Sequence, residues 1–272
     1  MKIKEAFPGN FERSSPIVRP ETTLLTILYL LRMKGADVVP VTLMRQATGR
    51  GVYGCSVLFK TTQTGPAGFA NLIRSPCLNA SDELSLVSEE DEIDALLHAF
   101  KLKRLGFAFV HKADDPTKGS ILSLSDVLSL FHSKTIRTGM TVEDVSSPIV
   151  SLPGETTLHD ALGLMYRHSY RRIFLSGEDG CVFDRQIMDR IFSPLVLEGP
   201  DPEQMCRDLL ARPLSEIEKT TPHAIDIKTP LPTAAAKLAN AKGGCLMTDQ
   251  HTLVTPWDAV MKPWLSGELN VG

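Results

Sequence analysis

The sequence has no apolar run long enough to cross a membrane. Its richest apolar stretch, residues 24–31, is eight residues long and ends at Arg32, whereas a transmembrane helix needs about 20 apolar residues. Residues 1–5 also lack the apolar core of a secretory signal peptide. We therefore expect a cytoplasmic protein that has no membrane partner.

Cysteine is scarce and has neither metal-binding nor disulfide spacing. The five cysteines are an odd number, scattered through 272 residues without a Cys-x-x-Cys pair. This pattern favours reduced thiols and argues against both a zinc site and a disulfide framework. The residues concerned are Cys55, Cys77, Cys181, Cys206 and Cys245.

Signatures of nucleic-acid binding and of catalysis are also missing. The formal net charge is −3, so the chain lacks the basic footprint of a nucleic-acid binder. The seven histidines show no His-x-x-x-His spacing, which argues against a metal site. No Gly-x-Ser-x-Gly motif, Walker-type loop or pair of carboxylates stands out. We therefore expect a protein that is not an enzyme.

The main feature of the sequence is a fourfold repeat. At 272 residues the chain is long enough for more than one core. Apolar side chains recur at i, i+3, i+4 and i+7 in four places whose starts lie 69, 65 and 73 residues apart. Each set predicts an amphipathic helix. The sets are Leu24, Ile27, Leu28 and Leu31; Ile93, Leu96, Leu97 and Phe100; Leu158, Ala161, Leu162 and Met165; and Leu231, Ala234, Ala235 and Leu238.

A short apolar run follows each of these helices and predicts a strand. The four runs are residues 38–41, 107–110, 173–175 and 245–247. Turns, a further strand and a second helix follow, most clearly at residues 126–131 and 257–260. Each repeat therefore reads as strand, helix, strand, strand, helix, and the fold class is α/β. A unit of about 65 residues has a thin core and favours pairing with another.

These repeats resemble the CBS (cystathionine β-synthase) domain family over nearly the whole chain. The third repeat is the most similar, from Met140-Thr141-Val142-Glu143-Asp144-Val145 through Ser147-Pro148-Ile149-Val150 to His168-Ser169-Tyr170-Arg171-Arg172. Residues 36–41 of the first repeat resemble the family's strand with its Pro-Val. Residues 209–217 resemble its lead-in segment.

The resemblance implies four tandem CBS units paired into two Bateman modules. The predicted units are residues 1–71, 72–135, 136–199 and 200–272, with the boundary between modules near residues 133–138. The first and second units are expected to pair, as are the third and fourth. The plan is similar to that of the gamma subunit of AMP-activated protein kinase. The resemblance leaves two arrangements possible: the four units of one chain could close into a disc, or two chains could form a homodimer.

The family's ligand fingerprint is intact in two of the repeats. It places a Ser or Thr at a strand end and an Asp three residues later. The carboxylate of this Asp can accept hydrogen bonds from both ribose hydroxyls. Here these positions are Ser123 with Asp126 and Thr255 with Asp258. Phe183 and Gln186 replace them in the third repeat. In the first repeat we align Gly54 and Val57, so two competent sites per chain are expected.

Each of these motifs also has a structural interpretation. The Ser–Asp and Thr–Asp pairs fit helix N-caps. His168, Arg171 and Arg172 lie at the end of a predicted helix, so they fit cations at its C-terminus as well as the phosphate clamp that the resemblance implies. Two further sets are interpreted structurally: Lys101, Lys103 and Arg104 as a solvated turn, and Trp257 and Trp264 as packing residues.

The function implied by the resemblance is sensing of adenine nucleotides (AMP, ADP or ATP) and signalling to a regulated partner protein, which is not identified. S-adenosylmethionine is a less favoured ligand. The rival interpretations are an adaptor with empty clefts, an enzyme with an unfamiliar site and a nucleic-acid binder. The negative charge disfavours the last of these.

Overall fold

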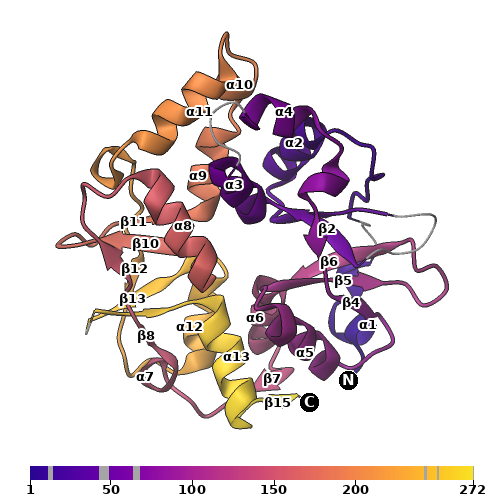
Figure 1. Ribbon diagram of the computed structural model, residues 1–272. Coiled ribbons are helices and arrows are strands. Elements are labelled where there is room, and N and C mark those ends of the chain that lie inside the picture. Colours follow the sequence, from indigo (N-terminus) through magenta and orange to yellow (C-terminus); the bar gives the residue numbers. More distant parts are fainter. Residues whose placement is uncertain (12–14, 43–48, 64–67, 242–243, 250, 272) are drawn as a thin grey trace. The chain divides into compact units, whose positions relative to one another are not determined.

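The structure is a computed structural model that describes residues 1–272 except 12–14, 43–48, 64–67, 242–243, 250 and 272. The predicted order of strand, helix, strand, strand, helix is confirmed in the last three repeats (Figure 1). These comprise β4 (Leu86–Ser88), α5 (Ile93–Lys103), β5 (Phe107–His111), β6 (Gly119–Ser123) and α6 (Leu124–His132); β9 (Ser151–Leu152), α8 (Leu158–His168), β10 (Arg172–Leu175), β11 (Cys181–Phe183) and α9 (Asp184–Ile191); and β12 (His223–Ile225), α12 (Leu231–Leu238), β13 (Leu246–Thr248), β14 (Thr252–Val254) and α13 (Pro256–Ser266).

The first repeat follows the same order with a reduced opening strand. It has α2 (Leu24–Lys34), β1 (Val38–Pro40), β2 (Arg50–Tyr53) and α3 (Gly54–Gln63). A single parallel bridge between Val18 and Val41 stands where the other repeats have their first strand. In each of the other three, the first strand pairs parallel with the second, and the second pairs antiparallel with the third. The mixed α/β class is therefore confirmed.

The predicted apolar stripes are the buried faces of the first helix of each repeat. All sixteen side chains in the four sets are buried in α2, α5, α8 and α12. The helices begin where a threonine, an acid or a proline precedes the stripe. Thr23 and Thr157 accept hydrogen bonds from the backbone N–H groups of Thr26 and Asp160, as N-cap residues do.

The chain divides into two compact units, each made of separated segments. Unit A comprises residues 1–14, 85–150 and 220–272, and unit B comprises residues 15–84 and 151–219. The second and fourth repeats thus lie in unit A, and the first and third in unit B. Residues 133–138, where the sequence predicted a module boundary, lie within unit A. The pairing of the first repeat with the second and of the third with the fourth stays a prediction, as do the residue limits of the four repeats.

A short lead-in segment precedes each repeat and packs on a different repeat. The segments contain α1 (Ile3–Ala6), η3 (Cys77–Ala80), α7 (Val142–Val145) and η4 (Leu214–Glu216). Backbone bridges join them to the starts of first helices: Lys2 to Glu92, Pro76 to Thr23, Thr141 to Pro230 and Pro213 to Thr157. Two lead-ins also add a strand to a sheet, β3 (Asp82–Glu83) beside β2 and β8 (Ser147–Pro148) beside β14. Neighbouring repeats therefore exchange their lead-in segments.

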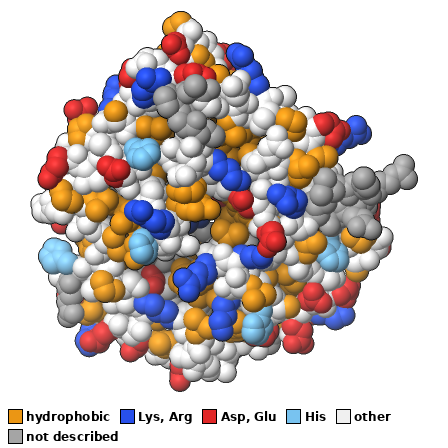
Figure 2. Space-filling view, in the orientation of Figure 1, with side chains coloured by type: hydrophobic (Ala, Val, Ile, Leu, Met, Phe, Trp, Pro, Cys, Tyr) orange, Lys and Arg blue, Asp and Glu red, His pale blue; other side chains and the backbone are white. Residues whose placement is uncertain are grey.

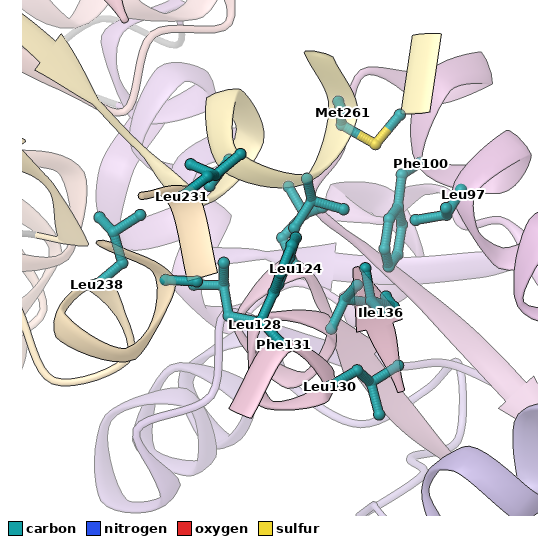
Figure 3. Close-up of a cluster of buried hydrophobic side chains, with 14 of the residues drawn as sticks. Leu97, Phe100, Leu124, Leu128, Leu130, Phe131, Ile136, Leu231, Leu238 and Met261 are labelled. Carbon is teal, nitrogen blue, oxygen red and sulfur yellow. The ribbon is translucent and has the colours of Figure 1, made fainter. Parts of the chain in front are cut away.

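The core of unit A forms where helices of the second and fourth repeats meet. Figure 3 shows Leu124, Leu128 and Phe131 of α6 among side chains of α5, α12 and α13. Helix α6 lies against both α12 and α13 (Figure 1). Strand β7 (Ile136–Arg137) pairs with the C-terminal β15 (Asn270–Val271), a contact that the repeat pattern did not predict.

The core of unit B is built in the same way from the first and third repeats. Helix α3 packs against α8 and α9, and the rings of Phe59 and Tyr166 stack with their centroids 3.6 Å apart. In the part of the chain that the structure describes, no helix is both long and apolar enough to span a bilayer. Figure 2 shows acidic and basic side chains interspersed over the drawn face.

Candidate functional site

The fingerprint residues of the second repeat form a capping box at the start of α6. Asp126 Oδ2 accepts hydrogen bonds from the Ser123 backbone N–H and hydroxyl, both at 2.7 Å. In return the Ser123 hydroxyl accepts from the Asp126 N–H at 3.4 Å. The sequence-based N-cap interpretation is therefore confirmed for this pair. One oxygen of the carboxylate, Oδ2, is therefore committed to the cap.

A lead-in residue binds the second oxygen of Asp126. Asn10 Nδ2 donates to Asp126 Oδ1 at 3.2 Å. Asn10 closes the 3-10 helix η1 (Pro8–Asn10), and its carbonyl oxygen accepts from the Ser120 hydroxyl at 2.5 Å. Asn10 therefore joins the N-terminal segment to both β6 and the start of α6. Nothing in the sequence pattern indicated this role.

The fingerprint of the fourth repeat forms the same cap at the start of α13. Asp258 Oδ2 accepts from the Thr255 backbone N–H at 3.0 Å and from its hydroxyl at 2.8 Å. Pro256 occupies the first helical turn, as expected at a position that needs no N–H donor. Asp258 is only 5% exposed, so its carboxylate requires internal partners.

Those internal partners are Ser147 and Lys262. The Ser147 hydroxyl donates to Asp258 Oδ1 at 2.7 Å, and Lys262 Nζ lies 3.1 Å from the same oxygen. The Lys262 ammonium also donates to the carbonyl oxygens of Val145 and Ser146 and to the Ser147 hydroxyl, at 2.6, 3.0 and 2.7 Å. Lysine 262 therefore fastens the third repeat's lead-in segment to α13.

The third repeat has lost the capping box, as the sequence predicted. Phe183 is the N-cap of α9 but makes no side-chain cap bond. Gln186 Nε2 donates to the Glu218 carbonyl oxygen at 2.6 Å, while its Oε1 is buried without a partner among the described residues. Arg190, one turn further along, pairs with the Glu218 carboxylate at 3.0 Å.

The sequence alignment of the first repeat is wrong by one residue. Strand register pairs Val38 with Tyr53, as it pairs Phe107 with Ser123. Tyr53 is therefore the counterpart of Ser123, and Ser56 that of Asp126, in place of Gly54 and Val57. The error arose because this segment has no Ser or Thr at the strand end, and no Asp three residues later, to anchor the alignment. The fingerprint is absent under either alignment.

Ser56 nevertheless makes an equivalent contact with its chemical roles reversed. Its hydroxyl donates to Asp82, an acid supplied by the lead-in segment. Lys60, four residues after Ser56, binds Asp82 Oδ1 at 2.9 Å and the Ala80 carbonyl oxygen at 2.8 Å. Lys60 thus acts in the first repeat as Lys262 does in the fourth.

One junction therefore recurs in all four repeats. The third residue of the second helix bonds to a lead-in segment in the pairs Asp126–Asn10, Asp258–Ser147, Ser56–Asp82 and Gln186–Glu218. A cation one turn later strengthens it in three repeats: Lys60, Arg190 and Lys262. Leu130 stands at that position in the second repeat and is buried. The i, i+4 spacing from the fingerprint was the signal that could have identified these cations.

Arg171, predicted as part of a phosphate clamp, is held by two carboxylates in unit B. Its Nε donates to Asp184 Oδ2 at 2.6 Å, and its terminal nitrogens donate to both oxygens of Asp37, at 3.2 and 2.9 Å. The Cys55 thiol also donates to Asp184. The cavity beside this cluster is only about 10 Å³, room for about one water molecule.

The charges in this cluster stabilise one another. Burial alone would raise the pKa of Asp184, but Arg171 and the Cys55 thiol hold it below its ordinary value of 3.8. Burial alone would lower the pKa of Arg171, but Asp184 and Asp37 raise it, so the guanidinium stays charged. Arg171 therefore has a structural role here, and a role toward phosphate stays a prediction.

The remaining predicted residues occupy different settings. His168 is exposed and its ring stacks on Tyr170, with centroids 5.4 Å apart. Arg172 begins β10, and its buried Nε has no hydrogen-bond partner among the described residues. Trp264 donates to Asp94 at 2.7 Å and packs edge-on against His98, which agrees with its interpretation as a packing residue.

The structure brings together some of the predicted site residues. Ser123 with Asp126 and Thr255 with Asp258 form two caps in unit A. His168, Arg171 and Arg172 belong to unit B, and their role as a phosphate clamp stays a prediction. No group of three or more His, Cys, Asp or Glu side chains lies close enough to hold a metal in the described ranges.

Part of the third repeat matches a known sequence family. Residues 142–182 match the sequence model of the CBS domain. A protein from Methanocaldococcus jannaschii, described as a proposed archaeal homologue of the gamma subunit of AMP-activated protein kinase, matches with a TM-score of 0.80 at 18% identity. The match covers 96% of this chain and 99% of that one.

Two further solved structures show the range of similarity. An uncharacterised conserved protein from Pyrococcus horikoshii matches with a TM-score of 0.56 at 13% identity, covering 96% of this chain and 99% of its own. A CBS domain protein from Pyrobaculum aerophilum, complexed with AMP, matches 46% of this chain and 89% of its own, with a TM-score of 0.37 at 12% identity. A search of curated protein sequences returns no match.

Proposed function

We propose that this chain, which carries a CBS domain at residues 142–182 and has the fold of tandem CBS-domain proteins throughout, is a regulatory module that binds adenosine-containing nucleotides. In this proposal Asp126 and Asp258 accept the ribose hydroxyls, next to Ser123 and Thr255. His168, Arg171 and Arg172 are the candidates for the phosphates. The output is a changed surface for a regulated partner protein.

The observation that carries the proposal is the pair of equivalent carboxylates in unit A. In both repeats the aspartate uses one oxygen for its own helix cap and presents the other to a side chain of a lead-in segment. Carboxylates are strong acceptors for hydroxyl donors, because one partner is charged. A helix N-terminus also favours an anionic group beside it.

The first experiment is a thermal-shift panel of AMP, ADP, ATP and S-adenosylmethionine. A ligand that binds the folded state raises its apparent stability. We expect at least one compound to raise the unfolding temperature, and calorimetry to find at most two tight sites per chain. Three or four sites of equal affinity would contradict the assignment, because the first and third repeats lack the aspartate.

Substitutions then test the two carboxylates. Asp126→Asn and Asp258→Asn keep the side-chain shape and remove the charge. Losing a hydrogen bond to a charged group costs about 1.5–3 kcal/mol, or roughly ten- to a hundredfold in affinity. The free energy of unfolding must be measured for each variant, because both residues also cap a helix. If the double variant folds and binds every compound as tightly as the parent, the ribose role is wrong.

A second candidate function is a structural adaptor that binds no nucleotide. Two observations favour it: Arg171 is engaged by Asp37 and Asp184, and Asp258 is buried among internal donors. An adaptor of this kind predicts that no compound in the panel changes the unfolding temperature of the chain. Its test is whether a partner protein, once known, binds the double variant as tightly as the parent.

A further inference from the structure

The geometry points to the lead-in segments as built-in competitors for the fingerprint carboxylates, with Asp126 the tighter nucleotide site and Asp258 the weaker. We infer this from the donors that already occupy each carboxylate. The inference rests on the proposed nucleotide-binding function and adds which residues set the affinity: Asn10 at one site, and Ser147 with Lys262 at the other.

An ionised carboxylate can accept about four hydrogen bonds, two at each oxygen. Asp126 Oδ2 accepts two, from the Ser123 N–H and hydroxyl. Oδ1 accepts one among the described residues, from Asn10 at the long distance of 3.2 Å. A ribose diol offers two hydroxyl donors. One hydroxyl can bind the acceptor position of Oδ1 that is open among the described residues, and the second has to displace only the Asn10 amide.

Three hydrogen bonds and an ion pair engage the carboxylate of Asp258. Oδ2 accepts from the Thr255 N–H and hydroxyl, while Oδ1 accepts from the Ser147 hydroxyl and lies 3.1 Å from the Lys262 ammonium. The ammonium is a charged competitor, and three further acceptors of the lead-in segment fix its position. A diol at Asp258 would therefore have to displace a hydroxyl and a cation, whereas at Asp126 it displaces one neutral amide.

Leu130 explains why the second repeat is the more open one. It stands where the other repeats carry Lys60, Arg190 or Lys262, so no cation reaches over the junction from α6. The N-terminal segment is still anchored elsewhere, since Ile3 and Phe7 are buried at 0% and 4% exposure. Displacing Asn10 would therefore release residues 8–11 and leave α1 in place.

The test is the affinity of AMP for the full chain and for Asn10→Ala. Removing the competitor should tighten AMP binding about three- to tenfold, because more of the protein is then in the binding-competent state. Asn79→Ala is the matched control, since Asn79 is exposed in the lead-in helix η3 and its side chain makes no hydrogen bond to another described residue; this variant should bind AMP like the parent. AMP should also accelerate hydrogen exchange at residues 8–11 of the parent.

The outcomes separate this inference from the proposed function. Tighter binding by Asn10→Ala, with Asn79→Ala unchanged, supports the inference, and so does binding by Asn10→Ala when the parent binds nothing. Equal or weaker binding by a folded Asn10→Ala, with the parent binding AMP, overturns the inference and leaves the proposed function standing. If the parent, Asn10→Ala and Ser147→Ala all fail to bind any compound of the panel, both are overturned.

Discussion

At the residue scale, equivalent positions in the four repeats carry different side chains that all bind a lead-in segment. The third residue of the second helix is Asp126, Asp258, Ser56 or Gln186, and each bonds to a lead-in segment. In the first repeat the hydroxyl and the acid have changed places, so the hydrogen bond survives. Such a position tolerates any pair of donor and acceptor, because an unpaired buried polar group is what costs stability.

The third repeat has Gln186 in place of the fingerprint acid, but it carries an acid two residues earlier. This residue is Asp184, at the first position of α9. We predict that Asp184→Asn lowers the free energy of unfolding at pH 7 by about 2 kcal/mol, because it weakens a buried bond to Arg171. The pKa of Asp184 lies below its ordinary 3.8 in the folded state. Its contribution is therefore present above that value and is lost as the pH falls below it.

Urea unfolding between pH 7 and about pH 2.5 checks this prediction. The parent should lose stability more steeply than Asp184→Asn below pH 3.8. Asp179→Asn is the matched control, because Asp179 is exposed in a turn, and it should follow the parent. Parallel curves for the parent and Asp184→Asn would show that the Arg171 pair contributes nothing to acid sensitivity.

At the element scale, helices are completed by side chains from other repeats. Arg185 of α9 donates to the carbonyl oxygens of Leu31, Arg32 and Ala36, at 3.2, 3.2 and 3.0 Å. Leu31 and Arg32 lie in the last turn of α2, where their carbonyl oxygens also accept from the backbone N–H groups of Ala36 and Gly35. A cation there also opposes the negative end of the helix dipole. One side chain of the third repeat thus binds the C-terminal end of a helix of the first.

We predict that Arg185→Met destabilises the protein by about 1.5–3 kcal/mol, the cost of losing hydrogen bonds to a charged donor. Hydrogen exchange should accelerate most at the C-terminal turn of α2, residues 31–36. Arg167→Met is the control, because Arg167 is exposed on α8 and its side chain makes no hydrogen bond within the described part of the chain. The capping role would be refuted if both variants unfolded at the same denaturant concentration as the parent.

At the scale of the whole molecule, the chain passes between its two units four times. Each unit therefore contains segments from both halves of the sequence. A break near residue 135 separates α6 from α12 and α13 in unit A, and α3 from α8 and α9 in unit B. Each half alone would expose the apolar faces that these helices bury.

We predict that fragments 1–135 and 136–272 are unstable alone and assemble when coexpressed. Affinity capture of a tagged fragment 1–135 should retain fragment 136–272 at equal stoichiometry. A variant with Leu128→Asp in the buried face of α6 should lose most of this capture, because a buried charge without a partner is costly. Two fragments that fold and stay monomeric separately would show that the interleaved units are not the stable bodies of the protein.

The sequence by itself determined the repeated order of elements, the four buried stripes and the two capping boxes. These features are local: an apolar period of 3.6 residues fixes a helix face, and Ser123 or Thr255 caps the helix that holds Asp126 or Asp258 three residues on. The interacting residues lie within a few helical turns of one another, so the local sequence pattern is enough to predict the interaction.

Only the tertiary structure decided which side chains complete the candidate sites. Asn10 reaches Asp126 across 116 residues, and Ser147 reaches Asp258 across 111. The pairing of Arg171 with Asp37 spans 134 residues. A lead-in segment has no apolar period or fingerprint from which its contact partner could be predicted. The repeat that it packs against is decided by tertiary packing. The occupancy of both carboxylates therefore could not be predicted from the sequence pattern.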